Sequence, residues 1–406
     1  MKNNVHQLFL VAALVSSACS KEKDQTSELG EAWDSRNSPA SMEDMFTSEN
    51  FSTKFSDLPL SAALSKTPWS GDYWATYRGG ISYRWLPALN SGRRTEHYAY
   101  KVLSESDIAA ASENNFINLS PAEKYDLYRE DNSFALTRFE RDRTRVLRTV
   151  EENIEYDASF DIPSWEGLCH SWAPATIVFE SPNPVTLKSI TGKHEITFGA
   201  SDVKALLTHF LDYERAASSY FLGSRCNYDF SKLQEQYDNG EITIEELNAV
   251  KKNSFCKGVN PGSFHIVIAN QIGLKDEGFI LDRTRDAEVW NQPVVSYEVE
   301  TTTSDREGND LAIYETAAPG TTEIVSVKMK MKYTTEIAHS FNNTDRQNSL
   351  VTENYEYYLE LNSSGEIIGG EWLTENRPDF MWKEQTPGFD GYYSELKDIY
   401  EASIRE

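Results

Sequence analysis

The sequence predicts an α+β protein in which helices come first along the chain and an antiparallel sheet follows. Two helical patterns lie in the first half, one beginning near Ser120 and the other near Ser201. After residue 260 the pattern changes to short apolar runs and strict alternation, of which residues 323–334 are the longest example. Because helices and strands occupy different parts of the chain, the α+β class is favoured over an alternating α/β class.

Each of these expected elements is supported by its local sequence. Ser120 followed by Pro121 and Glu123 is typical of a capped helix start. The stripe from Val203 to Leu211 has the 3.6-residue period of an amphipathic helix and is expected to face the core. Apolar and polar residues alternate over 324–332, as in an antiparallel strand with one wet face. The expected strands are 264–269, 278–282, 294–300, 323–334 and 355–361.

The composition excludes several classes of protein. The chain has 406 residues with 64 acidic and 39 basic side chains, which gives a net charge of −25. Nucleic-acid binding requires clustered cations, so no nucleic-acid partner is expected. Apolar residues make up 39% of the chain, too many for a chain that stays unfolded. Four cysteines are too few for a disulfide-dense scaffold, so each can have its own role.

Residues 1–18 are predicted to be an export signal. The apolar stretch from Leu8 to Ala18 is too short to span a bilayer. It ends in Ser17-Ala18-Cys19, which resembles the bacterial lipobox, in which the cysteine becomes the acylated N-terminus of the mature protein. Cys19 is therefore the predicted lipid anchor of a cell-envelope lipoprotein, on the outer membrane or facing the periplasm. An ordinary signal peptide cleaved near Ala18 is the alternative.

Three further segments are expected after the signal. Residues 19–67 are rich in Ser, Thr, Asp and Glu and predict a flexible acidic linker. Residues 68–300 are expected to form the core that carries the candidate site, with a helical insert at 226–256. Residues 301–406 are expected to form a C-terminal antiparallel β region packed on that core.

Cys169 is the candidate nucleophile. Gly167 precedes it and Trp165 and Trp172 flank it. A thiol at a helix N-terminus has its thiolate favoured by free backbone N–H groups and the helix dipole. Pro174 is expected to interrupt a helix that begins here. For an isolated cysteine, a buried structural role is the better explanation.

His265 and Asp282 are the candidate partners of Cys169. If residues 264–269 and 278–282 form a hairpin symmetric about Gly273-Leu274, these two side chains become direct cross-strand neighbours, with Cβ atoms about 5 Å apart. A carboxylate that orients an imidazole, which in turn takes the thiol proton, would complete a triad. The inference depends on register, and a satisfied core histidine remains the alternative. His170 is expected on the helix surface, pointing away from a substrate at the sulfur.

Cys226 and Cys256 bracket the helical insert, and export makes a disulfide between them natural. No zinc-ligand spacing occurs in the chain. Residues 238–246 are similar to the second half of a calcium loop, but the acidic ligands of the first half are missing. A capping box formed by Thr243 and Glu246 explains the same residues. No cofactor or metal is therefore predicted, although calcium remains open.

Several unusual strings resemble the transglutaminase elicitor family of Phytophthora, in the family's order and over residues 68 to 385. The segment from Glu288 to Val294 is similar to the family's surface elicitor peptide, although the chain departs from it after Val294. The other strings are Tyr73-Trp74 with Tyr77-Arg78-Gly79-Gly80, the residues around Cys169, Pro261-Gly262-Ser263-Phe264-His265, and Gly369-Gly370-Glu371-Trp372 with Arg377-Pro378-Asp379-Phe380.

The resemblance implies a protein-glutamine γ-glutamyltransferase with a cysteine-protease-like core. Cys169 stands at the family's nucleophile, and His265 and Asp282 fall in the blocks that carry its other active-site residues. The thiolate would attack a glutamine carboxamide of a protein or peptide, and a lysine or polyamine would resolve the thioester to an isopeptide bond. Three tryptophans are candidates for shielding the thioester from water: Trp165, Trp172 and Trp290.

Two other functions remain open. A cysteine protease or amidase would use the same Cys, His and Asp residues with water as the acceptor. A surface-binding lipoprotein would keep the fold without catalysis. The choice between transfer and hydrolysis depends on how well water is kept from the thioester.

Overall fold

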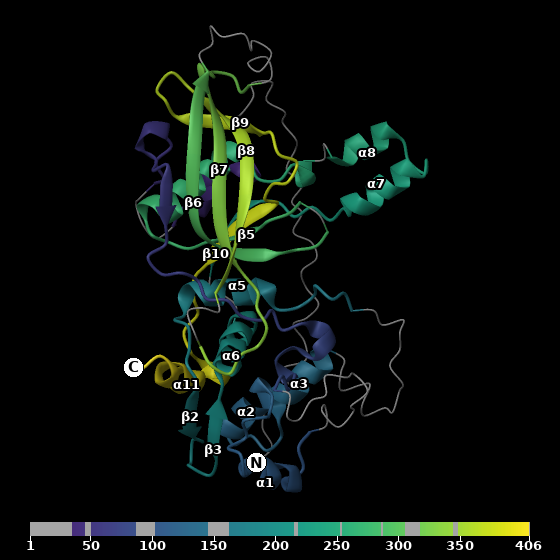
Figure 1. Ribbon diagram of the computed structural model, residues 1–406, viewed down its shortest axis with the longest axis vertical. Helices are drawn as coiled ribbons and strands as arrows, with labels where there is room; N and C mark the ends of the chain where they lie inside the picture. Colours follow the sequence, from purple (N-terminus) through teal and green to yellow (C-terminus); the bar gives the residue numbers. More distant parts are fainter. Residues whose placement is uncertain are drawn as a thin grey trace.

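One antiparallel sheet organises half of the molecule, and a group of helices forms the other half (Figure 1). The strand order is β4-β10-β5-β6-β7-β8-β9, with β1 paired to β6. The α+β class is confirmed. The strands are β1 (Ser61–Ala63), β4 (Ser219–Gly223), β5 (Ile280–Asp282), β6 (Asn291–Ser304), β7 (Glu323–Thr335), β8 (Ser349–Leu361), β9 (Ile367–Trp372) and β10 (Phe380–Glu384).

The computed structural model describes residues 35–44, 50–86, 102–144, 162–214, 218–251, 254–285, 287–304, 317–343 and 348–405. The predicted signal peptide and the anchor residue Cys19 lie outside these ranges. Within them, no helix is both long and apolar enough to cross a membrane.

The helical half contains six α-helices and a small hairpin within the described residues. Helices α5 and α6 lie closest to the sheet, and the others surround them (Figure 1). The elements are α1 (Glu105–Ser112), α2 (Pro121–Tyr128), α3 (Ala135–Arg143), α5 (Cys169–Val178), α6 (Ala200–Tyr213) and α11 (Leu396–Ser403), with the hairpin β2 (Val185–Lys188) and β3 (Glu195–Phe198).

The predicted helix starts are close to those observed. The Ser120 side chain accepts from the Glu123 backbone N–H, and the Glu123 carboxylate accepts from the Ser120 N–H, so the capping box of α2 is confirmed. Helix α6 begins at Ala200, slightly earlier than expected. The reason is that Asp202 accepts a hydrogen bond from the backbone of Gly199, at 2.7 Å, and so caps the helix from inside its first turn.

The strand expected at 264–269 is wrong, because these residues belong to helix α9 (Pro261–Ile268), which continues into a π-helical segment, Ala269–Leu274. Asn260 caps α9 by accepting from the backbone N–H groups of the first turn, and Pro261 suits its first position. Every residue of α9 is buried. A helix that is apolar all round lacks the 3.6-residue period, so a short run of this kind cannot be told from a buried strand.

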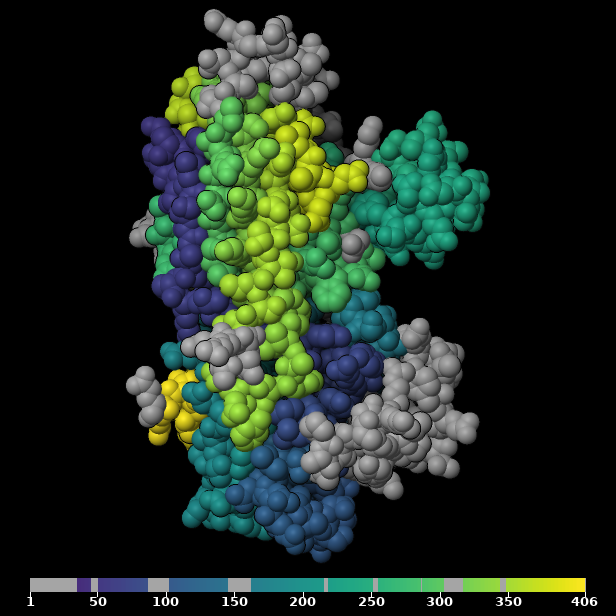
Figure 2. Space-filling view, viewed as in Figure 1, coloured from purple at the N-terminus to yellow at the C-terminus, as the bar shows by residue number. Residues whose placement is uncertain are grey.

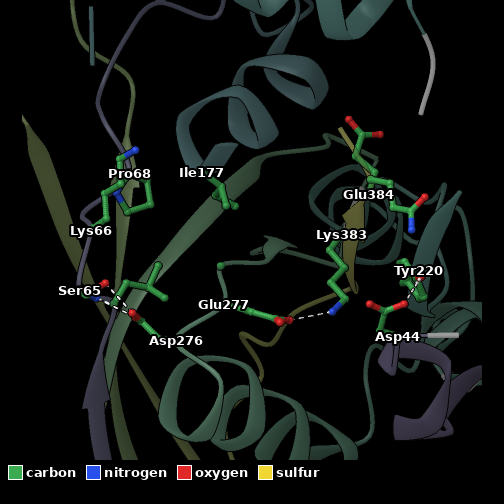
Figure 3. Close-up of a pocket in the computed structure, with 13 residues that line it drawn as sticks. Asp44, Ser65, Lys66, Pro68, Ile177, Tyr220, Asp276, Glu277, Lys383 and Glu384 are labelled. Carbon is green, nitrogen blue, oxygen red and sulfur yellow. Dashed lines mark hydrogen bonds and ion pairs between the residues drawn. The ribbon is translucent and has the colours of Figure 1, made fainter. Parts of the chain in front are cut away.

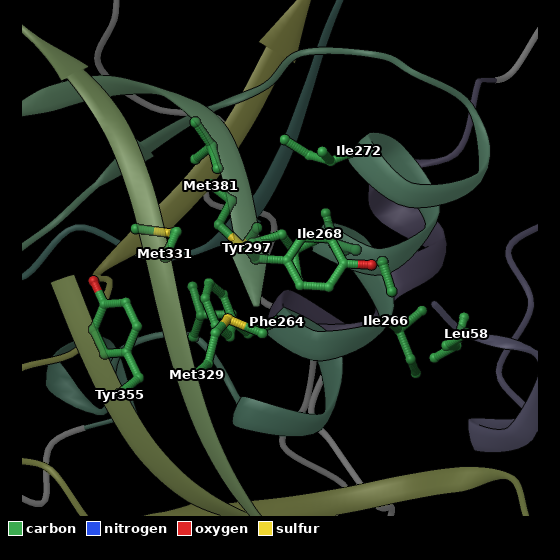
Figure 4. Close-up of a cluster of buried hydrophobic side chains, with 14 of the residues drawn as sticks. Leu58, Phe264, Ile266, Ile268, Ile272, Tyr297, Met329, Met331, Tyr355 and Met381 are labelled. Carbon is green, nitrogen blue, oxygen red and sulfur yellow. The ribbon is translucent and has the colours of Figure 1, made fainter. Parts of the chain in front are cut away.

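Two hydrophobic clusters meet at strand β5, one in the sheet half and one in the helical half. One packs α9 against β6, β7 and β8 (Figure 4). The other gathers α5, α6 and α2. Strand β5 joins both, because Leu281 belongs to the α9 cluster and Ile280 to the α5 cluster. Side chains alternate along a strand, so Asp282 shares the side of Ile280 and α5.

Two expected segment boundaries need correction. A flexible linker up to residue 67 is wrong for residues 50–67, because β1 pairs with β6 and the Ser52 backbone N–H donates to Asn270 Oδ1 at 2.9 Å. A boundary at 300 and 301 would cut β6, which runs from Asn291 to Ser304. The C-terminal part is not a separate region either, since β10 lies between β4 and β5.

The insert forms a helical hairpin of α7 (Phe230–Asp238) and α8 (Ile244–Lys251), which projects from the side of the sheet half (Figures 1 and 2). A disulfide joins Cys226 and Cys256 at its base. The Thr243 and Glu246 capping box is present, with Glu246 accepting from the Thr243 N–H at 2.8 Å.

Candidate active site

Cys169 is the first residue of α5. The backbone N–H of Leu168, just before it, donates to the carbonyl of Tyr73 at 2.6 Å, which ties the start of the helix to a distant loop. A Cβ on Gly167 would lie 2.6 Å from the same carbonyl oxygen, so only glycine fits this approach. The first N–H groups of a helix have no intrahelical acceptor and favour a thiolate at this position.

Pro174 does not interrupt this helix, contrary to the sequence-based expectation. Helix α5 runs from Cys169 to Val178 with Pro174 inside it. A proline in this position leaves the carbonyl of His170 without its usual intrahelical donor. Pro174 itself is buried, so packing against its neighbours offsets that loss.

The sulfur of Cys169 faces the start of β6. The side chain is buried, with the residue 7% exposed. Its Sγ lies 3.7 Å from the carbonyl oxygen of Val289 and 3.9 Å from Nδ2 of Asn291. The other end of the Asn291 amide, Oδ1, accepts from the indole N–H of Trp382 at 2.8 Å. The thiol therefore has an acceptor on one side and a fixed amide donor on the other.

His170 supplies an imidazole beside the sulfur. Its Nε2 lies 2.8 Å from Oδ1 of Asp212, in the last turn of α6, and its side chain is 52% exposed. Burial opposes the charge on this ring, but the hydrogen bond to Asp212 and the proximity of Cys169 raise the pKa of His170 to about 9. The pKa of Asp212 is correspondingly lowered: burial would raise it, and the His170 contact overcomes that effect. His170 is on the helix surface, as expected, but it does not point away from the sulfur, because it interacts with both Asp212 and Cys169.

Asp282 lies next to this group, on the strand that pairs with the start of β6. It is fully buried, and it pairs across the strands with Asn291, whose side chain reaches the sulfur. Oδ1 of Asp282 accepts the backbone N–H of Trp290 at 2.9 Å. Asp282 thus fixes the turn that leads into β6 and the segment that faces Cys169.

His265 lies apart from both. Its Nδ1 is 2.8 Å from the hydroxyl of Tyr357, and its ring is 5.7 Å from that of Phe55. Its Nε2 has no hydrogen-bond partner among the described residues. The cross-strand pair expected of His265 and Asp282 is wrong, because α9 is a helix and its cluster lies on the side of Leu281, away from α5.

The three tryptophans expected to shield the thioester have different surroundings. Trp172 is fully buried in the α5 cluster. Trp290 is half-buried beside the residues that face the sulfur, and its indole N–H donates to Glu288 at 3.0 Å. Trp165 is half-buried in the turn before α5. Of the three, only Trp290 adjoins residues that face the sulfur, Val289 and Asn291, and the shielding role stays a prediction.

Sequence reasoning missed Asp212, Asn291 and Trp382. Asp212 is brought to His170 only by the packing of α5 on α6, which no local pattern predicts. Trp382 comes from a strand near the end of the chain. Asn291 carried a signal, since it lies inside the segment that resembles the elicitor peptide.

A cavity of about 390 Å³ lies near the far end of α5, beyond Ile177 (Figure 3). Charged side chains line it, among them Glu277, which bonds to Lys383 at 3.1 Å. Burial raises the pKa of Glu384, at its rim, to about 7, although the charge on His170 works in the opposite direction. No cluster of three or more His, Cys, Asp or Glu side chains in the described ranges is arranged to hold a metal ion.

Comparisons with known proteins give a family and a similar fold. The sequence model of a family described as "Transglutaminase elicitor" matches residues 40–390. The fold is similar to the crystal structure of the GP42 transglutaminase from Phytophthora sojae, with a TM-score of 0.59 and 23% identity, over 87% of this chain and 94% of that one. No curated protein matches the chain in sequence.

Proposed function

Because the chain belongs to the transglutaminase elicitor family, we propose that it is a protein-glutamine γ-glutamyltransferase that works through a thioester on Cys169. One observation carries the proposal: the thiol at the start of α5 lies beside an imidazole that is itself paired with a carboxylate, at 2.8 Å. Nucleophile, base and orienting acid are the parts that cysteine-based acyl transfer requires.

The raised pKa of His170 determines the starting state. An imidazole with a pKa of about 9 is protonated at neutral pH. Cys169 then reacts as the thiolate of a thiolate–imidazolium pair, and Asp212 holds the ring in place. A cation beside the sulfur and the dipole of α5 both favour that thiolate.

Acylation follows from this pair. The Cys169 thiolate attacks the carboxamide carbon of a glutamine, and the carbonyl oxygen becomes an oxyanion. When the intermediate collapses, the C–N bond breaks and ammonia leaves with the proton of His170. The products of this step are a γ-glutamyl thioester and a neutral imidazole.

Transfer completes the cycle. A lysine or polyamine nitrogen attacks the thioester carbon while His170 takes its proton. The C–S bond then breaks, which releases an isopeptide and restores the thiolate–imidazolium pair. Cys169 is only 7% exposed. This enclosure restricts the access of water to the thioester and so supports transfer over hydrolysis.

Hydrolysis is the second candidate function, since the same residues would serve an amidase or a protease. One experiment separates them: the exported domain is incubated with a glutamine-containing protein and a labelled primary amine. We expect ammonia release with equal incorporation of the amine, and neither for Cys169→Ala. Ammonia without incorporation would establish hydrolysis instead, and a wild-type protein that yields neither would point to a binding lipoprotein.

His339 provides a matched control for the role of His170. It is a nearly buried imidazole that lies 3.6 Å from Asp72 and packs against Trp74 and Trp85, so its interactions are structural. We expect His170→Gln to lower kcat by about 10²-fold or more, in the range of lost acid–base catalysis. His339→Gln should change stability more than kcat.

A further inference from the structure

The thioester mechanism leaves one requirement unmet by Cys169 and His170. Both tetrahedral intermediates carry a negative oxygen, which needs hydrogen-bond donors aimed at it. The backbone N–H groups at the start of α5 can supply one donor. We propose that the side-chain amide of Asn291 supplies the second, and that Trp382 is the residue that positions it; the proposal rests on the acyl transfer put forward above.

The position of Asn291 meets the geometric need. It is the first residue of β6, it is 3% exposed, and its Nδ2 lies 3.9 Å from the sulfur of Cys169. A substrate carbonyl carbon bonded to that sulfur would place its oxygen within reach of the same N–H group. The site is shielded from water, where a fixed donor stabilises charge more strongly than it does in solvent.

Trp382 decides which end of the amide faces the sulfur. Its indole is a donor only, and it occupies Oδ1 of Asn291 at 2.8 Å. If the Asn291 amide were flipped, its NH₂ group would face the indole N–H, and two hydrogen-bond donors would meet. Nδ2 is therefore held toward Cys169. Trp382 is fixed in turn by β10, where it pairs with Ile280 of β5 and Phe221 of β4.

The contacts of the sulfur divide between its two protonation states. The carbonyl of Val289, 3.7 Å away, can accept only from the thiol S–H. The amide of Asn291 donates, so it favours the thiolate and then the oxyanion. The hydrogen bond from Asn291 to the oxyanion forms only during the reaction, which is the condition for an effect on kcat rather than on substrate binding.

The test measures kcat and KM for amine incorporation by the whole exported domain. We expect Asn291→Ala to lower kcat by about 10²-fold with little change in KM, as for the loss of one oxyanion donor. Asn291→Asp keeps the shape and the acceptor for Trp382 but has no N–H group, so it should lower kcat at least as far. Two variants with the same defect guard against a fault in folding, which circular dichroism checks directly.

Trp382→Phe removes the indole N–H and keeps an aromatic ring. We expect kcat to fall about tenfold, because an unheld amide spends less time in the productive orientation. Trp372→Phe is the matched control: its indole also donates to one oxygen, the carbonyl of Val259 at 2.7 Å, but it packs in the α9 cluster. That variant should leave kcat within about twofold, as expected for a distant independent site.

A double mutant separates positioning from mere stability. If Trp382 acts through Asn291, adding Trp382→Phe to the Asn291→Ala variant should not lower kcat any further. If Trp382→Phe lowers kcat by the same factor in the wild-type protein and in Asn291→Ala, the positioning role is overturned. If kcat is unchanged in Asn291→Ala and in Asn291→Asp, the oxyanion role is overturned. Failure of the proposed function looks different: the wild-type protein would then incorporate no amine, whatever residue 291 is.

Discussion

Nε2 of His170 lies 2.8 Å from Oδ1 of Asp212, and this contact joins the first turn of α5 to the last turn of α6. Two adjacent residues, Cys169 and His170, thereby become a nucleophile and a base held by a third group. Neighbouring residues do not usually face each other on a helix. Here the first is at the helix start, and the sulfur is close enough to the ring to raise the pKa of His170.

Replacing Asp212 should therefore change the charge on His170 and, through it, the reactivity of Cys169. Burial opposes the imidazolium and Asp212 supports it, so Asp212→Asn should lower the pKa of His170 from about 9 toward or below 6.5. The rate of Cys169 alkylation by iodoacetamide at pH 7 to 9 should fall, because the imidazolium that favours the thiolate is lost. Asp398→Asn, at an exposed position of α11, is the control. An unchanged alkylation profile in Asp212→Asn would contradict the pairing.

His265 should matter for stability in acid and little for catalysis. Burial lowers the pKa of His265 to about 4, whereas the unfolded chain protonates near 6.5. The folded protein then binds fewer protons, so this contribution is complete above pH 6.5 and is lost as the pH falls toward 4. The loss approaches about 3 kcal/mol, at about 1.4 kcal/mol for each pKa unit.

The variant His265→Gln tests both statements. Its free energy of unfolding should fall less steeply between pH 6.5 and 4 than that of the wild type, as measured by urea titration. Its kcat should stay within a few-fold, whereas a catalytic base would cost about 10²-fold or more. A kcat collapse in a folded His265→Gln would restore the triad that the sequence suggested.

Glu123 should be a large contributor to the stability of the helical half. Its carboxylate accepts from Arg84 at 2.6 Å and from Arg141 at 2.9 Å, and it is fully buried. Burial alone would raise its pKa, but the two guanidinium groups hold it at about 2. This stabilisation is complete above pH 4.5 and is lost as the pH falls toward 2.

We expect Glu123→Gln to lower the free energy of unfolding by about 3 kcal/mol, because it removes the anion between two cations in the interior. Glu356→Gln is the control, since Glu356 is half-exposed and only 3.6 Å from Lys328 on the surface of the sheet. That change should cost less than about 1 kcal/mol. Equal effects in the two variants would refute the assigned importance of burial.

The lipid anchor remains a proposal that labelling can test. Cells that express the full chain and are fed a labelled fatty acid should yield a labelled, membrane-associated protein. The variant Cys19→Ser should lose the label and leave the membrane fraction, because one acyl cysteine is the proposed attachment. A labelled Cys19→Ser protein would place the lipid elsewhere.

The sequence predicted those structural features that depend on local patterns of residues. The cap of α2, the apolar stripe of α6 and the alternation of β7 are short-range signals, and each corresponds to an element at about the expected residues. The helix start at Cys169 also followed from its immediate neighbours. These elements are determined by steric and hydrogen-bonding requirements among residues that are close together in the sequence.

Other features depend on tertiary contacts, which form only when the chain folds. The run around His265 is buried on all sides, so neither helical nor strand periodicity is visible in it. The partners of Cys169 and His170 come from α6, β6 and β10, far away in the chain. Asn291 is neutral, and its importance arises only from the indole that orients it, so no charge or spacing rule singles it out.

Strand β10 has a consequence for how this protein comes into being. It is made from residues 380–384 of a 406-residue chain, yet it occupies an interior place in the sheet, between β4 and β5. A chain emerging N-terminus first cannot close this sheet until residue 384 has been delivered. Trp382 arrives with the same strand, so the oriented amide at the sulfur forms only once β10 is in place. Any product that stops before β10 would carry Cys169 without that arrangement, which couples the reactivity of the thiol to the insertion of this strand.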